Sequence, residues 1–183
     1  DVLLAEIAEI DFPLERLLID ENAVIISDRH KRLEGTSGLI EEIGSTGSGT
    51  GAAVIERIQR GGSLTFAKND TRLPRQCLDH ARRFLRDRLN QNKQIILEGT
   101  QGFGLSLLHS DDYPNVTSRD TTAATFVAEA GLSPMDVDEV VMVIRAFPIR
   151  VAGDSGPLPN EIDWDTVTRE SGSSTQIVER TSV

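Results

Sequence analysis

The sequence predicts a layered α/β fold, because segments with helical periodicity alternate with short apolar segments typical of buried strands. The clearest helix is expected at residues 73–92, where Pro74 opens an amphipathic pattern. A strand is expected immediately afterwards, at residues 94–98, and it runs into a glycine turn at 99–102. The β-branched, apolar run at 137–147 predicts a further buried strand.

Shorter elements are expected on either side of these segments. Leucine and isoleucine side chains at helical spacing predict a helix over residues 3–10, and the apolar run at 23–27 predicts a short strand. A further helix is expected at 121–131, where Gly131 and the nearby Pro134 mark its end. The length suits one domain, so we expect these elements to form a single layered unit.

Composition limits the classes of function. The 183 residues carry a formal net charge of −10, which argues against a general nucleic-acid or anionic-membrane surface. No apolar run is long enough to span a bilayer and no signal-peptide pattern is present, so a cytoplasmic protein is expected. The single cysteine, Cys77, allows no internal disulfide and is expected to be a buried structural thiol. Residues 54–93 carry a local charge of +6, typical of a solvated helix face or of the basic rim of an anion pocket.

A loop rich in glycine, serine and threonine, at residues 43–51, runs into a helix expected at 52–57. Such a loop can direct backbone N–H groups and hydroxyls at a phosphate from a helix N-terminus. The same composition is typical of a flexible linker, and the loop lacks the Gly-Lys-Ser/Thr sequence of a triphosphate-binding P-loop. Arg60 follows this helix, and its planar guanidinium suits a phosphate on this subunit or on a neighbouring one.

Two further segments carry polar groups suited to a ligand. Gln101 lies on the glycine turn and offers the acceptor and donors that a purine edge requires, although an ordinary turn residue gives the same pattern. Thr117 and Ser118 can bind phosphate, whereas the nearby Asp120 can simply cap the following helix. The acidic pair at 111–112 lacks a second ligand set, and no histidine has metal-pair spacing, so no metal site is assigned.

Five segments form a pattern when they are taken in chain order. They are residues 26–29 (ISDR), 43–47 (IGSTG), 97–102 (LEGTQG), 113–118 (YPNVTS), and 145–153 (RAFPIRVAG) with 156–159 (GPLP). In this order they resemble the adenylosuccinate synthetase family over nearly the whole chain. Five motifs in the family's order are more specific than any one of them alone.

The resemblance implies the fold and the site. It implies a P-loop-NTPase-like α/β/α arrangement with a mixed, mostly parallel central sheet. Gln101 resembles the catalytic glutamine beside the purine 6-position, and Arg60 resembles the arginine that reaches the IMP phosphate from the partner subunit of a homodimer. Thr46 and Thr117 resemble the threonines that bind this phosphate, and the backbone around Val151 and Gly153 resembles the lining of the ribose pocket. The implied IMP-binding residues are therefore Thr46, Arg60, Gln101, Thr117, Val151 and Gly153.

The resemblance also implies the reaction. The family joins IMP to L-aspartate with GTP and Mg²⁺ in purine nucleotide biosynthesis. The γ-phosphoryl group of GTP moves to the purine 6-oxygen, and the aspartate amine then displaces phosphate. We therefore expect IMP, L-aspartate and GTP as substrates, with the main ligands of GTP and Mg²⁺ outside this chain.

Several features of the family do not occur in this sequence. Among them are the N-terminal GDEGKGK motif, which holds the catalytic aspartate and a Mg²⁺ ligand, the arginine-rich aspartate loop and the NKxD-like guanine site. We therefore expect residues 1–183 to be the central portion of a single synthetase-like domain, inactive in isolation. Departures such as Ser48 and Ala52, where the family has arginine and proline, leave two alternatives open. These are an aspartate ligase acting on dGMP in a diaminopurine pathway and a catalytically inert nucleotide-binding or dimerisation module.

Overall fold

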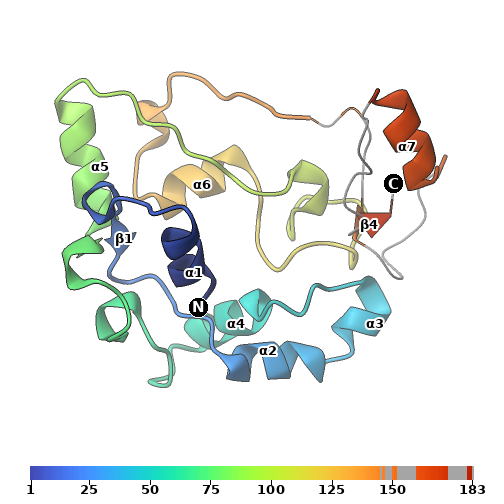
Figure 1. Ribbon diagram of the computed structural model, residues 1–183, viewed down its shortest axis with the longest axis horizontal. Coiled ribbons are helices and arrows are strands. Elements are labelled where there is room, and N and C mark those ends of the chain that lie inside the picture. The colour runs from blue at the N-terminus through green and yellow to red at the C-terminus, as the bar shows by residue number, and fades with distance from the viewer. Residues whose placement is uncertain (145, 147–149, 152–159, 173–180, 183) are drawn as a thin grey trace. The chain divides into compact units, whose positions relative to one another are not determined.

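The computed structural model describes residues 1–144, 146, 150–151, 160–172 and 181–182 (Figure 1). The described part is rich in helices and contains one parallel and one antiparallel pair of short strands. None of its helices is long and apolar enough to cross a membrane. The chain divides into two compact units, the first comprising Asp1–Ile26, Ala53–Thr100 and Thr122–Asp138, the second Ser27–Ala52, Gln101–Thr121 and Glu139–Val183.

Figure 1 labels the α-helices and the strands β1 and β4. The α-helices are α1 (Val2–Glu9), α2 (Asp28–Gly35), α3 (Leu39–Ile43), α4 (Thr50–Gln59), α5 (Ala81–Asn90), α6 (Ala123–Glu129) and α7 (Trp164–Glu170). The 3-10 helices are η1 (Leu14–Arg16), η2 (Ala67–Asn69), η3 (Arg75–Cys77), η4 (Phe103–Leu105) and η5 (Pro134–Asp136). The strands are β1 (Ile19–Asp20), β2 (Leu78–Asp79), β3 (Arg150–Val151) and β4 (Thr181–Ser182).

The first unit is organised around the parallel pairing of β1 with β2, in which Ile19 faces Leu78 and Asp20 faces Asp79. Helix α5 follows β2 closely, and a carboxylate oxygen of Asp20 accepts a hydrogen bond from its first backbone N–H, that of Ala81 (3.0 Å). A carboxylate at this position satisfies a backbone donor that the helix leaves unpaired and complements the helix dipole. The strand pairing therefore fixes where α5 begins.

Small side chains form the core of this unit. Ala67 and Cys77 are 0% and 1% exposed, and the Cys77 thiol lies 3.5 Å from the carbonyl oxygen of Leu14, to which it donates. The predicted burial of Cys77 is confirmed. In the same unit, Arg86 on α5 forms a bidentate ion pair with Asp136 on η5, with distances of 2.9 and 2.5 Å.

The helix predicted at 73–92 begins only at Ala81. The residues before it form η3 and then β2, which pairs with β1, so strand pairing prevails over the helical periodicity of the sequence. The other predicted helices are confirmed: the patterns at 3–10, 52–57 and 121–131 correspond to α1, α4 and α6.

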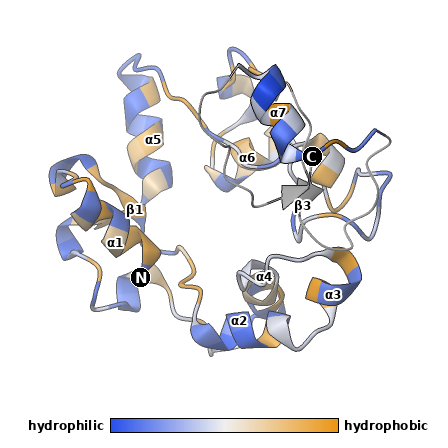
Figure 2. Cartoon of the chain, turned by 45° about the vertical axis from the view of Figure 1, so that its right-hand side comes forward, coloured by the Kyte–Doolittle hydropathy of each residue, from blue (hydrophilic) through white to orange (hydrophobic). Residues whose placement is uncertain are grey.

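The three predicted strands are not strands in the described part of the chain. Val24 makes only an isolated bridge, and residues 94–98 and 137–144 lie outside any strand. Residues 137–144 and most of residues 94–98 are exposed, to 92% for Ile96 and 91% for Val143, whereas residues 23–25 are half-buried. Figure 2 shows hydrophobic colour on extended segments outside the helices. A strand requires a neighbour for its backbone N–H and C=O groups, and the described residues supply no ladder for residues 94–98 and 137–144. Residues 23–25 do have a neighbour, but their pairing with residues 65–67 does not extend beyond the single bridge. The end of the last prediction, at 145 and 147, lies outside the described residues.

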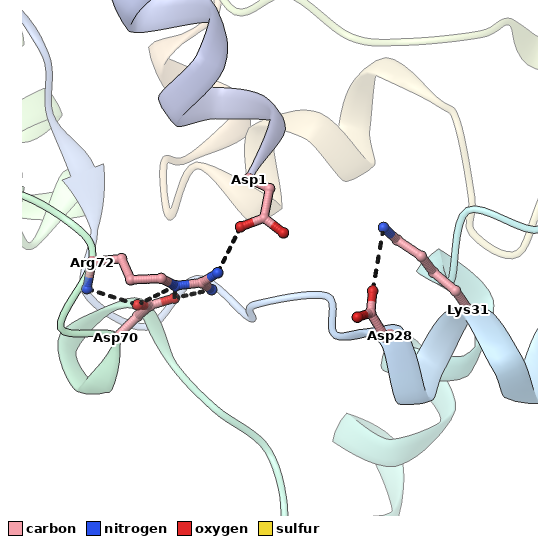
Figure 3. Close-up of polar contacts among 5 residues, drawn as sticks. All are labelled: Asp1, Asp28, Lys31, Asp70 and Arg72. Carbon is pink, nitrogen blue, oxygen red and sulfur yellow. Dashed lines mark hydrogen bonds and ion pairs between the residues drawn. The ribbon is translucent and has the colours of Figure 1, made fainter.

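A charge cluster in the first unit joins Arg72 to two aspartates (Figure 3). The guanidinium of Arg72 lies 2.6 Å from the buried carboxylate of Asp70 and 2.6 Å from the exposed carboxylate of Asp1. The backbone N–H of Arg72 also donates to Asp70 (2.9 Å). These hydrogen bonds from Arg72 lower the pKa of Asp70 from 3.8 to about 2. Figure 3 also shows the exposed pair of Asp28 and Lys31, which lies on α2 in the second unit.

Replacing Asp70 with asparagine should lower the free energy of unfolding at neutral pH by about 1–2 kcal/mol, a value reduced by the half-exposure of Arg72. Because the pKa of Asp70 is depressed in the folded state, its contribution is complete above its ordinary pKa of 3.8 and is lost as the pH falls towards about 2. Urea unfolding across this pH range, with the exposed Asp138→Asn as control, measures the effect. Equal losses in the two variants at neutral pH would contradict the assignment.

Candidate functional site

The second unit contains three of the segments that the sequence predicts to bind a ligand: the glycine-rich loop, the Gln101 turn and the Thr117 segment. Two hydrogen bonds join the turn to the threonine segment. The backbone N–H of Thr117 donates to the carbonyl of Leu105 (2.9 Å), and the hydroxyl of Thr121 donates to the carbonyl of Gly102 (2.7 Å). Gln101 and Thr117 are therefore held on one framework of backbone.

The glycine-rich loop packs against the same framework where α4 begins. A Cβ added at Gly51 would lie 3.2 Å from the Cβ of Ser118, which is closer than nearly all real contacts of this kind. A larger residue here would need Ser118 or Glu34 to shift by a few tenths of an ångström, because the loop backbone passes directly beside their side chains. The loop that carries Thr46 thus lies against the segment that carries Thr117.

A buried hydroxyl fixes the fold of the segment that follows Gln101. Ser106 is 0% exposed, donates to the carboxylate of Asp120 (2.6 Å) and accepts from the backbone N–H groups of Leu108 (3.2 Å) and His109 (3.1 Å). Of the two alternatives left open for this segment, Asp120 is not the N-cap of α6, because Thr122 supplies the side-chain cap. Asp120 instead accepts from Ser106, a contact that no local sequence pattern predicts.

A carboxylate from within the chain binds the N-terminus of α4. Glu34, only 7% exposed, accepts hydrogen bonds from the backbone N–H groups of Gly49 (2.6 Å), Gly51 (2.5 Å) and Ala52 (3.2 Å). The sequence leaves open whether these donors point at a phosphate or belong to a simple linker; in the structure Glu34 accepts from the N–H groups of Gly49, Gly51 and Ala52. Sequence reasoning missed Glu34 because it lies 15 to 18 residues from the groups that it binds.

The two predicted phosphate-binding threonines differ in exposure. Thr46 is exposed, and within the described residues its hydroxyl has no hydrogen-bond partner. Thr117 is half-buried and uses its backbone N–H within the framework, while its hydroxyl makes no hydrogen bond to a described residue. Both hydroxyls can therefore serve a ligand.

Arg60 and Gln101 share an unusual backbone conformation. Their φ angles are +57° and +63°, in the left-handed region that favours glycine, and both residues are exposed. A side chain at such a position costs about 1 kcal/mol, and such strain is concentrated at functional sites. Arg60 lies directly after α4 in the first unit, where its N–H donates to the carbonyl of Arg57 (3.1 Å). Both predicted site residues thus occupy positions where stability alone would select glycine.

Of the two residues predicted to line the ribose pocket, the structure describes only Val151. Val151 lies in β3, where it pairs with Thr181 of the antiparallel strand β4, and Gly153 lies outside the described residues. Among the described residues, no group of three or more histidine, cysteine, aspartate or glutamate side chains can hold a metal ion. The described residues therefore do not form a site for the implied Mg²⁺, and we assign it no ligand and no step.

Comparisons with known proteins give the chain's relatives. The family model described as adenylosuccinate synthetase matches residues 63–180. Adenylosuccinate synthetase of Pyrococcus horikoshii is 40% identical over 156 residues, which are 85% of this chain and 44% of that protein. The enzyme of Methanococcus aeolicus is 39% identical over 166 residues, 89% of this chain and 48% of that protein. The chain thus spans less than half the length of these curated relatives.

Two solved structures have a similar fold. Succinoaminodeoxyadenylate synthetase of cyanophage S-2L, bound to dGMP and to dATP as an energy donor, superposes with a TM-score of 0.66 at 34% identity, over 80% of this chain and 44% of that chain. Adenylosuccinate synthetase of Plasmodium falciparum superposes with a TM-score of 0.77 at 21% identity, over 99% of this chain and 53% of that chain. The predicted α/β fold class is confirmed, and the chain corresponds to part of that fold.

The left-handed backbone at Gln101 predicts a gain in stability on replacement with glycine. Gln101→Gly should raise the free energy of unfolding by about 0.5–1 kcal/mol, because it removes the clash of the Cβ in this region. Gln101→Ala keeps the Cβ and should leave stability nearly unchanged. Urea unfolding of both variants provides the comparison; a Gly variant less stable than the Ala variant would show that the turn is not held in this conformation.

Proposed function

The chain belongs to the adenylosuccinate synthetase family, and we propose that it is the central portion of a single-domain enzyme that joins L-aspartate to IMP. The enzyme uses GTP, acts in purine nucleotide biosynthesis and resides in the cytoplasm. Residues 1–183 supply much of the IMP site, and the chain alone is inactive. The observation that carries this proposal is the joining of the Thr46 loop, the Gln101 turn and the Thr117 segment within one unit.

In this proposal the phosphate of IMP lies between the hydroxyls of Thr46 and Thr117. The exposed hydroxyl of Thr46 and the half-buried one of Thr117 are both without hydrogen bonds to described residues, which supports this role. A phosphate has several acceptor oxygens, and hydroxyl donors from two segments fix its orientation as well as its position. The backbone near Val151 and Gly153 lines the ribose pocket.

Gln101 acts on the purine ring. Its amide donates to the 6-oxygen, which attacks the γ-phosphorus of GTP; N1 of the purine loses its proton to a base outside this chain, GDP leaves and a 6-phosphoryl intermediate forms. The amine of aspartate then attacks C6, the C–O bond breaks, phosphate leaves and the nitrogen loses a proton. Donors aimed at the oxygen where charge develops are worth most when they are preorganised, and the strained turn at Gln101 supports such a role. In the complete enzyme Mg²⁺ would be held by residues outside this chain and would supply positive charge to the phosphates of GTP.

Arg60 serves the site of the partner subunit in a homodimer. Its guanidinium is exposed and makes no ion pair within the described residues, so it is available to a phosphate. Its strained position directly after α4 supports a role that glycine could not fill. The planar guanidinium can bind two phosphate oxygens at once.

A second candidate substrate is dGMP. The solved structure that is 34% identical to this chain is a succinoaminodeoxyadenylate synthetase bound to dGMP. The chemistry at C6 is the same for both purines, so the residues proposed above serve either one. Comparing the affinities of the complete enzyme for IMP and for dGMP therefore distinguishes the two candidates.

The enzyme expressed from its complete gene should form GDP and phosphate only when IMP and L-aspartate are both present. Gln101→Ala should lower kcat by about 10²–10³-fold with a smaller change in KM, because the lost donor acts mainly in the transition state. The exposed Gln94→Ala is the matched control. Product formation from dGMP in place of IMP would select the second candidate, and turnover with neither would refute aspartate ligation.

Arg60→Ala should raise the KM for the nucleotide about tenfold, and the difference should shrink in high salt, because an exposed charge interaction is screened. Arg83→Ala, an exposed arginine on α5, is the control. Mixing Arg60→Ala subunits with Gln101→Ala subunits should restore activity, since hybrid dimers then contain one intact site. No recovery on mixing would mean that Arg60 acts within its own subunit or not at all.

A further inference from the structure

We propose that Glu34 is a positioning residue that holds the glycine-rich loop, residues 43–51, in place. This inference rests on the proposed function. Its carboxylate spans the end of the loop and the start of α4, with one oxygen on Gly49 and the other on Gly51 and Ala52. Glu34 does not contact the substrate in this scheme. It acts through Thr46.

The loop is anchored on both sides of Thr46. On one side, the N–H groups of Gly44 and Ser45 donate to carbonyls of α3 at 3.1 Å each. On the other side, the N–H of Gly49 donates to Glu34 at 2.6 Å. Only residues 46–48 lie between these anchors, so the carboxylate restricts where the Thr46 hydroxyl can be.

Glu34 is itself firmly held. It lies in the last turn of α2, is only 7% exposed, and its carbonyl accepts from the hydroxyl (2.7 Å) and the N–H (3.1 Å) of Ser37. A buried carboxylate is stable when several donors surround it, and the helix N-terminus supplies both the donors and a favourable dipole. Glu34 and α4 therefore form a rigid base for the loop.

The Glu34 carboxylate has two opposing effects on nucleotide binding, one through its charge and one through the position of the loop. A fixed carboxylate repels a nearby phosphate, so if repulsion dominated, removing the charge would tighten nucleotide binding. If positioning dominates, removing the charge loosens the loop and weakens binding, because small displacements of binding groups cost large factors. Glu34→Gln separates the two, since glutamine has the same shape but turns its NH₂ group towards one of the backbone donors.

The test is steady-state kinetics of the complete enzyme with Glu34→Gln and the exposed control Glu41→Gln on α3. We expect Glu34→Gln to raise the KM for IMP about 10- to 100-fold, with kcat and the KM for aspartate within about threefold of wild type. A purely structural role would instead lower the fraction of active enzyme and leave the KM for IMP unchanged. An unchanged or lowered KM for IMP would overturn the proposal.

Two further variants keep the test decisive if Glu34→Gln folds poorly. Gly51→Ala would place a Cβ about 3.0 Å from Oε1 of Glu34, so it should raise the KM for IMP in the same direction without removing a charge. In a Thr46→Ala background, Glu34→Gln should raise the KM for IMP by less than about threefold, because the Thr46 hydroxyl that Glu34 positions is already absent. If the effects of the two substitutions on the KM for IMP were independent and multiplied, the proposal would be overturned.

A wild-type enzyme without turnover of IMP would refute the proposed function together with this inference, whereas an active wild type with an unaffected variant refutes the inference alone.

Discussion

Buried backbone N–H groups must have acceptors, and this requirement shapes the whole chain. The strand ladders in the described residues are only two residues long, so side chains from distant segments supply many acceptors instead. Asp20 binds the start of α5, Glu34 binds the start of α4, and Ser106 binds the turn that follows Gln101. The Asp20 and Glu34 contacts join segments that the sequence separates, and each fixes the beginning of a helix. Ser106 holds its own turn locally and joins it to a distant segment by donating to Asp120.

The same requirement accounts for the form of the candidate site. Exposed groups that bind ligands are most effective when the backbone beneath them is rigid. Gln101 is exposed on a strained turn, and the next residue in that turn, Gly102, accepts a hydrogen bond from the hydroxyl of Thr121. The Thr46 loop is anchored at its far end by Glu34. The buried hydrogen bonds thus offset the conformational cost of presenting exposed side chains at fixed positions.

Sequence patterns predict the elements that depend on neighbouring residues, but they do not predict contacts and strands that depend on distant residues. Helices α1, α4 and α6 follow from local periodicity and end signals. The run at 137–144 has strand composition, but strand formation depends on a partner elsewhere, and the described residues supply none. The motif order predicts Thr46, Gln101 and Thr117 as site residues, and the structure brings their segments together without testing their roles. Glu34 could not be predicted, because nothing near it in the sequence marks it as the cap of a helix 16 residues away.

The uncovered run at 140–144 has a consequence for the handling of the chain in solution. Its five apolar side chains are 60–91% exposed, and β-branched residues predominate. Exposed, extended apolar segments without charges pair readily with one another between molecules, and this is the usual route to aggregates. In concentrated solution residues 1–183 on their own should therefore self-associate through this run.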